Sequence, residues 1–247
     1  MAASSSELPG GAVSSVVRVG NTVRRRMAER ADYVHRLLAH FEAHRWTAAP
    51  RFLGVDDEGR EVLSYLEGHV AWEEEQPDGV GSDECLQVVG RLVREFHDLT
   101  AGASLAEGAE VVCHNDLAPR NTVYRSAGDL LRPVAFIDWD SAAPGKRIHD
   151  VAHACWQYVG LGPRYADVAD AARRVRLLCD AYGLDDRRDV VETILWWQDR
   201  CWRGIDAKAD AGDEAMSYLR ARGAVSDVRA CYDWVAEHRT VFEAAMK

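Results

Sequence analysis

The segment 111–144, VVCHNDLAPRNTVYRSAGDLLRPVAFIDWDSAAP, places polar side chains between apolar runs that read as β-strands. Asp116 follows the apolar run 111–113, and Asp138 follows the run 133–137. A carboxylate beside a buried strand costs free energy unless a nearby cation compensates its charge. We therefore expect a positive group, such as a metal ion, to join these two carboxylates.

The spacing of the polar residues matches a catalytic-loop pattern. Residues 114–121 read H-N-D-L-A-P-R-N, which satisfies H-x-D-L-x-P-x-N, and I-D-W-D follows at 137–140. Five specified positions would coincide by chance in a chain of this length with a probability of roughly 10⁻⁴. An ordinary turn therefore explains the pattern poorly, although Asp and Asn favour turns. Asp138 taken alone could also cap the turn after its strand.

This pattern suits the transfer of a phosphoryl group. The reaction needs a carboxylate beside the attacking hydroxyl and oxygen ligands for Mg²⁺ on the far side of the transferred group. Asp116 and Asn121 lie five residues apart on one loop, so one can face the acceptor and the other the metal. Asp138, from the neighbouring strand, supplies a charged ligand. Mg²⁺ prefers carboxylate, amide and phosphate oxygens, which this set offers.

On these residues the chain resembles the aminoglycoside phosphotransferase family of small-molecule kinases, which share the protein-kinase fold. The resemblance is specific over 111–153 and weaker in the helical tail. It implies that Asp116 is the catalytic base, or orients the substrate hydroxyl, and that Asn121 and Asp138 bind Mg²⁺. His114 is the second catalytic-loop candidate, and we interpret it as a brace for the loop rather than an acid or base.

Two further acidic residues belong to this part of the chain. The resemblance implies that Asp150, in IHDVAHA, ties down the catalytic loop. Asp140 is adjacent to the expected metal site, and we do not assign it as a ligand.

The expected nucleotide-binding side departs from the family pattern. The fold normally has a lysine on its third strand that grips the phosphates and pairs with a glutamate on the next helix, but no lysine precedes Lys146. Arg25 is the candidate substitute, because a guanidinium can hold two phosphate oxygens at once. No glutamate falls at the helix position, which is Val34 or His35; Asp32 or Glu29 could serve if the helix is rotated.

The rest of the nucleotide site is inferred from the same resemblance. Gly10 and Gly11 are all that remains of a glycine-rich loop. The hinge, whose backbone would bind the nucleotide base, is expected over 63–66, which includes Ser64, Tyr65 and Leu66.

The order of the predicted elements indicates an α+β, bilobal protein-kinase-like fold with a reduced β-rich N-lobe and a larger helical C-lobe. Residues 1–66 predict strands at 12–19 and after the turn at Gly20-Asn21, a helix over about 29–44, and a hairpin around DDEG. Residues 67–247 begin with a polar connector over 68–82 and a helix capped by Ser82. They continue with short strands at 111–113, 122–124 and 133–137, and with helices at about 149–159, 164–182, 187–206, 213–222 and 226–245.

Charge and composition exclude several classes of partner. The net charge of −10 argues against a nucleic-acid surface, which needs clustered Lys and Arg. No apolar run approaches the roughly 20 residues that span a bilayer. The N-terminus lacks a secretion-signal pattern, and six widely spaced cysteines favour free thiols over disulfides. We therefore expect a cytoplasmic protein that binds no nucleic acid and no membrane; its oligomeric state is left open.

The predicted function is an ATP- or GTP-dependent, Mg²⁺-requiring phosphotransferase that moves the γ-phosphate to a hydroxyl of a small molecule, with an aminoglycoside-like antibiotic as one candidate. Two alternatives stay open: a kinase-fold binding protein that transfers nothing, and a metal-dependent hydrolase built on His114, Asp116, Asp138 and Asp140. The acceptor could be cationic, because acidic residues could form a wall for it. A solvated helix face explains these acidic residues equally well. They are Asp199, Asp206, Asp210, Asp213 and Glu214. Trp196 and Trp197 are interpreted as core residues, with a pocket lining as the alternative.

Overall fold

A five-stranded antiparallel sheet forms one end of the molecule, in the computed structural model that describes residues 5–7 and 16–247 except 74 and 129. The strand order is β1-β2-β3-β5-β4. Their bounds are β1 Ser5–Glu7, β2 Val17–Val19, β3 Thr22–Arg26, β4 Phe52–Val55 and β5 Arg60–Ser64. The turn at Gly20 and the β4–β5 hairpin are confirmed. Residues 12–15 of the predicted first strand lie outside the described residues.

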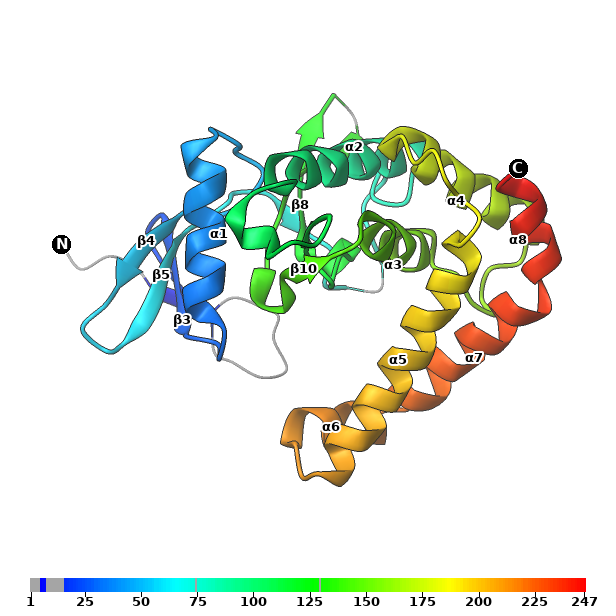
Figure 1. Ribbon diagram of the computed structural model, residues 1–247. Coiled ribbons are helices and arrows are strands. Elements are labelled where there is room, and N and C mark those ends of the chain that lie inside the picture. Colours follow the sequence, from blue (N-terminus) through cyan, green and yellow to red (C-terminus); the bar gives the residue numbers. More distant parts are fainter. Residues whose placement is uncertain (1–4, 8–15, 74, 129) are drawn as a thin grey trace.

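Helix α1 (Ala31–Ala43) lies along this sheet (Figure 1). Its bounds agree closely with the helix predicted over about 29–44. Its apolar stripe is buried, with Leu37, Leu38 and Phe41 at most 2% exposed. The stripe recurs at helical spacing, so one face of the helix packs inward while the opposite face stays polar. This face joins a hydrophobic core that continues without a break into the helical part of the chain.

An aromatic cluster joins the sheet end to the helical end. The ring of Phe41 on α1 lies 5.0 Å from that of Trp139, and Trp139 lies 5.2 Å from Phe96, centroid to centroid. Phe96 belongs to α2 (Asp83–Thr100), whose first turn is capped by Ser82 through the Cys85 N–H, as predicted. The cluster therefore fixes α1 against the turn that carries Asp138.

Two small sheets position the central loops. Strand β7 (Val111–Cys113) pairs with β10 (Ala143–Gly145), and β8 (Thr122–Ala127) lies between β6 (His69–Val70) and β9 (Leu130–Phe136). Strand β6 lies inside the segment that the sequence predicts as an irregular connector, because its backbone pairs with Tyr124 and Val123 of β8. The predicted β8–β9 hairpin is confirmed.

The remaining chain is helical, as predicted, and extends away from the sheets (Figure 1). Helices α3 (Arg147–Val159) and α4 (Val168–Tyr182) pack beside α2, while α5 (Val190–Asp210) pairs with α7 (Ala224–Glu237). Figure 1 shows α5 and α7 as an arm that projects from the body, with α6 (Glu214–Ala221) at its far end.

The last predicted helix, 226–245, is wrong in one respect, because it is divided into α7 and α8 (Arg239–Ala245) at His238. The His238 imidazole Nδ1 bonds the Trp234 carbonyl oxygen at 2.8 Å. This side-chain bond accompanies the break, and Phe242, fully buried, anchors α8.

The predicted two-lobed α+β fold class is confirmed by this architecture. The division at 66/67 stays a prediction. All six cysteines are free thiols. Among the described residues, no helix combines the length and apolar character needed to cross a bilayer.

Candidate active site

The loop between β7 and β8 carries both Asp116 and Asn121, as expected, and it also brings their side chains into contact, which the sequence did not predict. The short 3₁₀ turn Pro119–Asn121 folds the chain back. The side-chain nitrogen Nδ2 of Asn121 then donates to Asp116 Oδ2 at 2.8 Å and to the Asp116 carbonyl oxygen at 2.9 Å. Since the bonds among the described residues use its amide nitrogen, the amide oxygen of Asn121 is the atom left to bind a cation.

His114 is fully buried, and both of its ring nitrogens are engaged. Its Nδ1 accepts the Asp116 backbone N–H at 3.3 Å, so its Nε2 carries the proton and donates to the Ile137 carbonyl oxygen at 3.1 Å. A neutral imidazole has one donor and one acceptor, and both are used here. This geometry favours the brace over an acid, a base or a metal ligand.

Asp150, at 0% exposure, holds the same loop from helix α3. Its carboxylate accepts the backbone N–H groups of His114 at 2.6 Å and Asn115 at 2.9 Å, which matches the predicted tie. His97 was not identified from the sequence; its Nε2 donates to Asp150 Oδ2 at 3.1 Å. Its Nδ1 accepts from the Tyr182 hydroxyl at 2.8 Å, because the carboxylate fixes the proton on Nε2.

These contacts determine the charge states of two buried side chains, His97 on α2 and Asp150 on α3. Burial lowers the pKa of His97 against the pull of Asp150, so the imidazole stays neutral. Burial alone would raise the pKa of Asp150, but the hydrogen bonds from His97 and from the Asn115 N–H oppose it, and the pKa is lowered. Cys113 lies close enough to join a three-ligand group with His97 and Asp150, with the ligand atoms within 4.8 Å. Because both oxygens of Asp150 already accept hydrogen bonds, we interpret this group as structural.

Two residues of the site adopt a left-handed backbone conformation. Asn115 and Asp138 both have φ of 63°, which costs free energy in residues other than glycine and is concentrated at functional sites. The Asn115 side chain donates to the Ser141 carbonyl oxygen at 3.0 Å and so ties the loop to the turn Trp139–Ser141. These contacts fix Asp138 relative to the 114–121 loop.

No single side chain among the described residues joins Asp116 to Asp138: Arg120 pairs with Asp116, whereas Arg25 joins Asp138 to Asp140, the acidic pair of this site. Its Nη1 lies 3.1 Å from Asp138 Oδ1, and its Nη2 contacts Asp140. Burial works to lower the pKa of Arg25, but the carboxylates of Asp140, Glu61 and Asp138 outweigh it and raise the pKa. Burial raises the pKa of Asp140, and the Arg25 charge opposes this effect.

Arg25 takes its partner from a strand rather than from a helix. Strands β3 and β5 pair Arg25 directly with Glu61, and Arg25 Nε donates to Glu61 Oε1 at 2.6 Å. The expectation that Asp32 or Glu29 of the helical segment serves as this partner is wrong. Helix α1 contributes His35 instead, whose Nε2 lies 2.7 Å from Glu61 Oε2 and whose ring stacks on Phe52.

The donor set suits a hard divalent cation. The carboxylates of Asp138 and Asp140 keep 45% and 36% of their side-chain surface exposed, and the Asn121 amide oxygen comes from the adjoining loop. These are the oxygen ligands that Mg²⁺ takes in proteins. His114 adds no nitrogen ligand, because both of its nitrogens are engaged.

The hinge candidates follow directly from β5. Ser64 N–H donates to the Arg51 carbonyl oxygen and Tyr65 N–H to the Asn21 carbonyl oxygen, both at 2.9 Å. Of the three candidates, Leu66 is the one whose N–H has no backbone partner among the described residues, so a nucleotide base would find its donor there. The other part of the predicted nucleotide site, Gly10 and Gly11, lies outside the described residues.

On the other side of Asp116, helices α3 and α5 border the loop. Arg120, which the sequence analysis did not identify, places Nη2 2.7 Å from Asp116 Oδ1 and Nη1 3.3 Å from Gln157 Oε1 of α3. On α5, burial raises the pKa of Cys201 to about 11, while the charges of Arg120 and Asp116 also act on this thiol. Helix α5 packs against α3.

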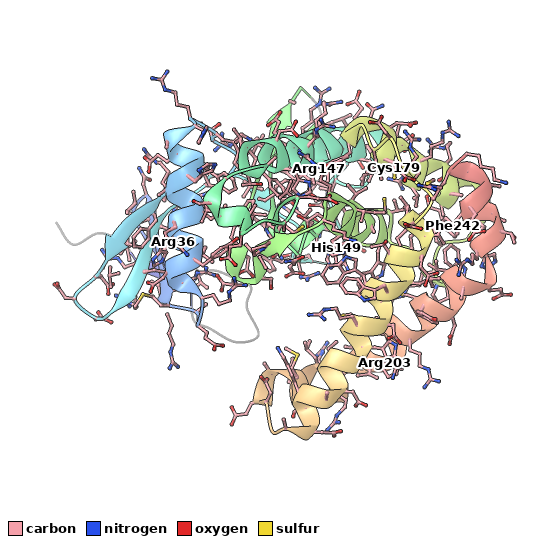
Figure 2. All side chains as sticks on the ribbon, viewed as in Figure 1. Arg36, Arg147, His149, Cys179, Arg203 and Phe242 are labelled. Carbon is pink, nitrogen blue, oxygen red and sulfur yellow. The ribbon has the colours of Figure 1, made fainter. Side chains whose placement is uncertain are left out.

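The two neighbouring tryptophans have different environments. Trp197 is a core residue, as interpreted, and its indole N–H donates to the His149 carbonyl oxygen at 2.7 Å. For Trp196 the core interpretation is wrong, because the ring is 43% exposed and stacks on the His149 ring at 5.2 Å. His149 belongs to α3 (Figure 2), so its contact with Trp196 of α5 places an exposed aromatic surface where these two helices meet.

Three of the five candidate acidic residues, those on α5, form ion pairs with arginines. Asp199 pairs with Arg203 at 2.8 Å, and Arg220 pairs with Asp206 at 3.1 Å and Asp210 at 2.6 Å. Arg203 lies on the projecting arm (Figure 2). For these three residues, the alternative of a solvated helix face therefore fits better than an acidic wall.

The chain has relatives among known proteins. Residues 82–192 match the family described as "Phosphotransferase enzyme family". The chain is 31% identical to the trifolitoxin immunity protein of Rhizobium leguminosarum bv. trifolii, over 97% of each chain.

Solved structures show the same fold at lower identity. The macrolide 2′-phosphotransferase of Brachybacterium faecium superposes with a TM-score of 0.63 at 17% identity, over 92% of this chain and 91% of that one. An aminoglycoside phosphotransferase in complex with GDP and kanamycin gives a TM-score of 0.58 at 12% identity, over 99% and 93% of the two chains.

Proposed function

Because the chain belongs to the phosphotransferase enzyme family, we propose that it transfers the γ-phosphate of ATP or GTP to a hydroxyl group of a small molecule. The observation that carries this proposal is the contact between Asp116 and Asn121, in a loop whose backbone N–H groups are bound by the Asp150 carboxylate. It presents a carboxylate to an acceptor and an amide oxygen to a metal from one rigid segment, as phosphoryl transfer requires.

Asp116 orients the acceptor hydroxyl and takes its proton during transfer. Its Oδ2 is held by Asn121 and its Oδ1 by Arg120, so the carboxylate has a defined direction before the acceptor binds. A positioned base of this kind contributes about 10²- to 10⁴-fold in rate. His114 acts through Asp116, because its Nδ1 fixes the Asp116 backbone.

Arg25, Asn121, Asp138 and Asp140 form the phosphate side of the proposed site. Asn121 and Asp138 would hold Mg²⁺, with Asp140 adjacent. When bound, the ion would neutralise negative charge on the phosphate oxygens. Arg25 binds phosphate oxygens through its two Nη groups, in the bidentate manner that a guanidinium allows, while Glu61 keeps its Nε in place.

The acceptor would lie over α3 and α5, next to Asp116. Trp196 offers an exposed aromatic face there, and the pairing of Asp199 with Arg203 leaves little free negative charge on this helix. A relative named for immunity to trifolitoxin supports a toxin or antibiotic as the acceptor. We propose this class, acting in the cytoplasm where nucleoside triphosphates are available, and the arginine pairing disfavours a strongly cationic member of it.

The test is a screen of aminoglycosides, macrolides, peptide antibiotics and amino alcohols with ATP or GTP and Mg²⁺, read by the mass gain of one phosphate. The matched pair of variants is Asp116→Asn and Asp186→Asn, the latter being an exposed aspartate. We expect Asp116→Asn to lose transfer and the slow hydrolysis of nucleotide by water, with nucleotide affinity retained. Asp186→Asn should behave as the wild type.

Two outcomes would contradict the proposal. Full activity of Asp116→Asn would remove Asp116 from the reaction. A wild type that binds nucleotide and an antibiotic, yet neither transfers phosphate nor hydrolyses nucleotide, would indicate a kinase-fold binding protein. The alternative of a metal-dependent hydrolase is not favoured, because His114 has no free nitrogen.

A further inference from the structure

We propose that Arg25 is a built-in cation that occupies Asp138 and Asp140 when no metal–nucleotide complex is bound, and that Glu61 is the positioning residue that lets Arg25 exchange these carboxylates for phosphate oxygens. The inference rests on the proposed function, which assigns the phosphate side to these residues. It goes further, because it predicts how metal and nucleotide binding depend on each other.

The three nitrogen atoms of the Arg25 guanidinium have different environments. Nε faces Glu61, whose side chain is 2% exposed, across the directly paired strands β3 and β5. Nη1 and Nη2 face Asp138 and Asp140, whose side chains are 45% and 36% exposed. One edge of the guanidinium is therefore held inside the sheet, and the other edge meets partners that solvent and ligands can reach.

Glu61 is itself fixed by a second contact. Its Oε2 bonds His35 Nε2 at 2.7 Å, and the His35 ring stacks on Phe52 with a centroid distance of 3.6 Å. A buried carboxylate with both oxygens engaged cannot turn away without breaking both contacts. Glu61 therefore keeps Arg25 directed at the acidic pair through Nε, whichever partners the Nη groups have.

The charges around Arg25 require compensation from elsewhere. One guanidinium meets three carboxylates, those of Glu61, Asp138 and Asp140. A divalent ion arriving alone must displace the Nη groups, which would then lose their partners. Phosphate oxygens arriving with the ion give the Nη groups new acceptors, so the exchange costs less.

The consequence is positive coupling between metal and nucleotide. The wild type should bind Mn²⁺, used as a paramagnetic substitute for Mg²⁺, weakly when no nucleotide is present. A nucleotide should strengthen Mn²⁺ binding in two ways: its phosphate oxygens bind the ion, and they also give the Nη groups of Arg25 new acceptors. The total gain in Mn²⁺ affinity should therefore exceed the gain from the phosphate oxygens alone. Coupling between two ligands of this kind is typically about 5- to 150-fold.

The experiment measures Mn²⁺ binding without nucleotide, by electron paramagnetic resonance or calorimetry, in the wild type and Arg25→Met. We expect Arg25→Met to bind Mn²⁺ about tenfold more tightly than the wild type, and to bind ATP more weakly. The control is Arg24→Met, because among the described residues Arg24 forms an ion pair with Asp56 and not with Glu61, Asp138 or Asp140. The Mn²⁺ affinity of this variant should equal that of the wild type. Adding Asp138→Asn to Arg25→Met should remove the gain.

Two further variants keep the inference testable if Arg25→Met does not fold. Arg25→Lys replaces two Nη donors by one ammonium and should give a smaller gain in Mn²⁺ affinity. Glu61→Gln should weaken the hold on Arg25, so that ATP affinity falls; recovery in Glu61→Asp would support the positioning role.

An Mn²⁺ affinity that Arg25→Met and Arg25→Lys leave unchanged or lower would overturn the inference. This result is separate from the proposed function, because wild-type phosphate transfer could still be observed. Conversely, the expected gain in Mn²⁺ affinity together with a wild type that transfers no phosphate would overturn the proposed function alone.

Discussion

The carboxylate of Asp150 lies 2.6 Å from the backbone nitrogen of His114, although the two residues are 36 positions apart in the chain. This bond joins the first turn of α3 to the start of the catalytic loop. A carboxylate that is fully buried and accepts three hydrogen bonds holds the loop in a conformation that its left-handed residue, Asn115, would not favour alone.

We expect Asp150→Asn to destabilise the protein by about 3 kcal/mol, because the amide group would turn a donor toward N–H donors in a buried site. The loop should also lose order, so phosphate transfer should fall. Urea unfolding monitored by tryptophan fluorescence measures the first effect. Asp186→Asn, on the surface, should change the free energy of unfolding by no more than about 0.5 kcal/mol; a similar small effect for Asp150→Asn would refute the structural role.

Stability should fall as the pH is lowered from about 6.5 toward 4. Burial lowers the pKa of His153 to about 4, against the opposing charges of Asp116 and Asp150, whereas an unfolded histidine titrates near 6.5. Below about pH 6.5 the unfolded chain binds a proton that the folded chain does not, so the free energy of unfolding decreases, by up to about 3 kcal/mol from this group. His97, whose pKa is also lowered by burial, acts in the same direction.

Chemical denaturation at pH 7.5 and pH 5 measures this effect. His153→Gln keeps a donor for the Leu117 carbonyl oxygen, which His153 Nδ1 contacts at 3.0 Å, but carries no titratable group. The difference in stability between the two pH values should shrink in this variant. An unchanged difference would show that His153 does not contribute to the pH dependence.

Alanine substitutions at Trp196 and Trp197 should distinguish an effect on acceptor binding from an effect on stability. Trp197→Ala removes a buried ring and should cost about 3–5 kcal/mol of stability. Trp196→Ala removes an exposed ring and should change stability by less than about 1 kcal/mol, while the KM for the acceptor rises by up to about tenfold. Equal effects of the two substitutions on stability, with no change in KM, would show that Trp196 does not contact the acceptor.

Phe41→Ala should destabilise the protein by about 3–5 kcal/mol, because a buried aromatic ring leaves a cavity between α1, α2 and the Trp139 turn. Thermal unfolding measures the change. The matched control is Val55→Ala on β4, where the side chain is 52% exposed and the change should stay within about 0.5 kcal/mol. Two separate unfolding transitions in Phe41→Ala would show that this cluster couples the two lobes.

Local patterns in the sequence predicted the parts of the site that lie close together in the chain. The spacing of Asp116 and Asn121 indicated that one loop carries both, and the Ser82 cap, the β8–β9 hairpin and the α1 stripe followed from short-range rules. Periodicity also predicted the succession of C-terminal helices, although not the break at His238.

The residues that sequence analysis missed have partners far away in the chain. Glu61 meets Arg25 only because β3 pairs with β5, and this register is set by tertiary contacts. An oppositely charged cross-strand pair stabilises a sheet, so the pair could have been found once the strand order was known. His97 and Arg120 gave no comparable signal, because a lone histidine or arginine on a helix or loop has many ordinary explanations.

Arg25 also determines which covalent reagents can label the protein. Lysines occur only at positions 146, 208 and 247, so an amine-directed nucleotide analogue would find no lysine on the strand that carries Arg25. A guanidinium stays protonated at neutral pH and is a poor nucleophile. Reagents that acylate a lysine would therefore have no target on this strand, and dicarbonyl compounds, which react with guanidinium groups, would be the reagents to use there.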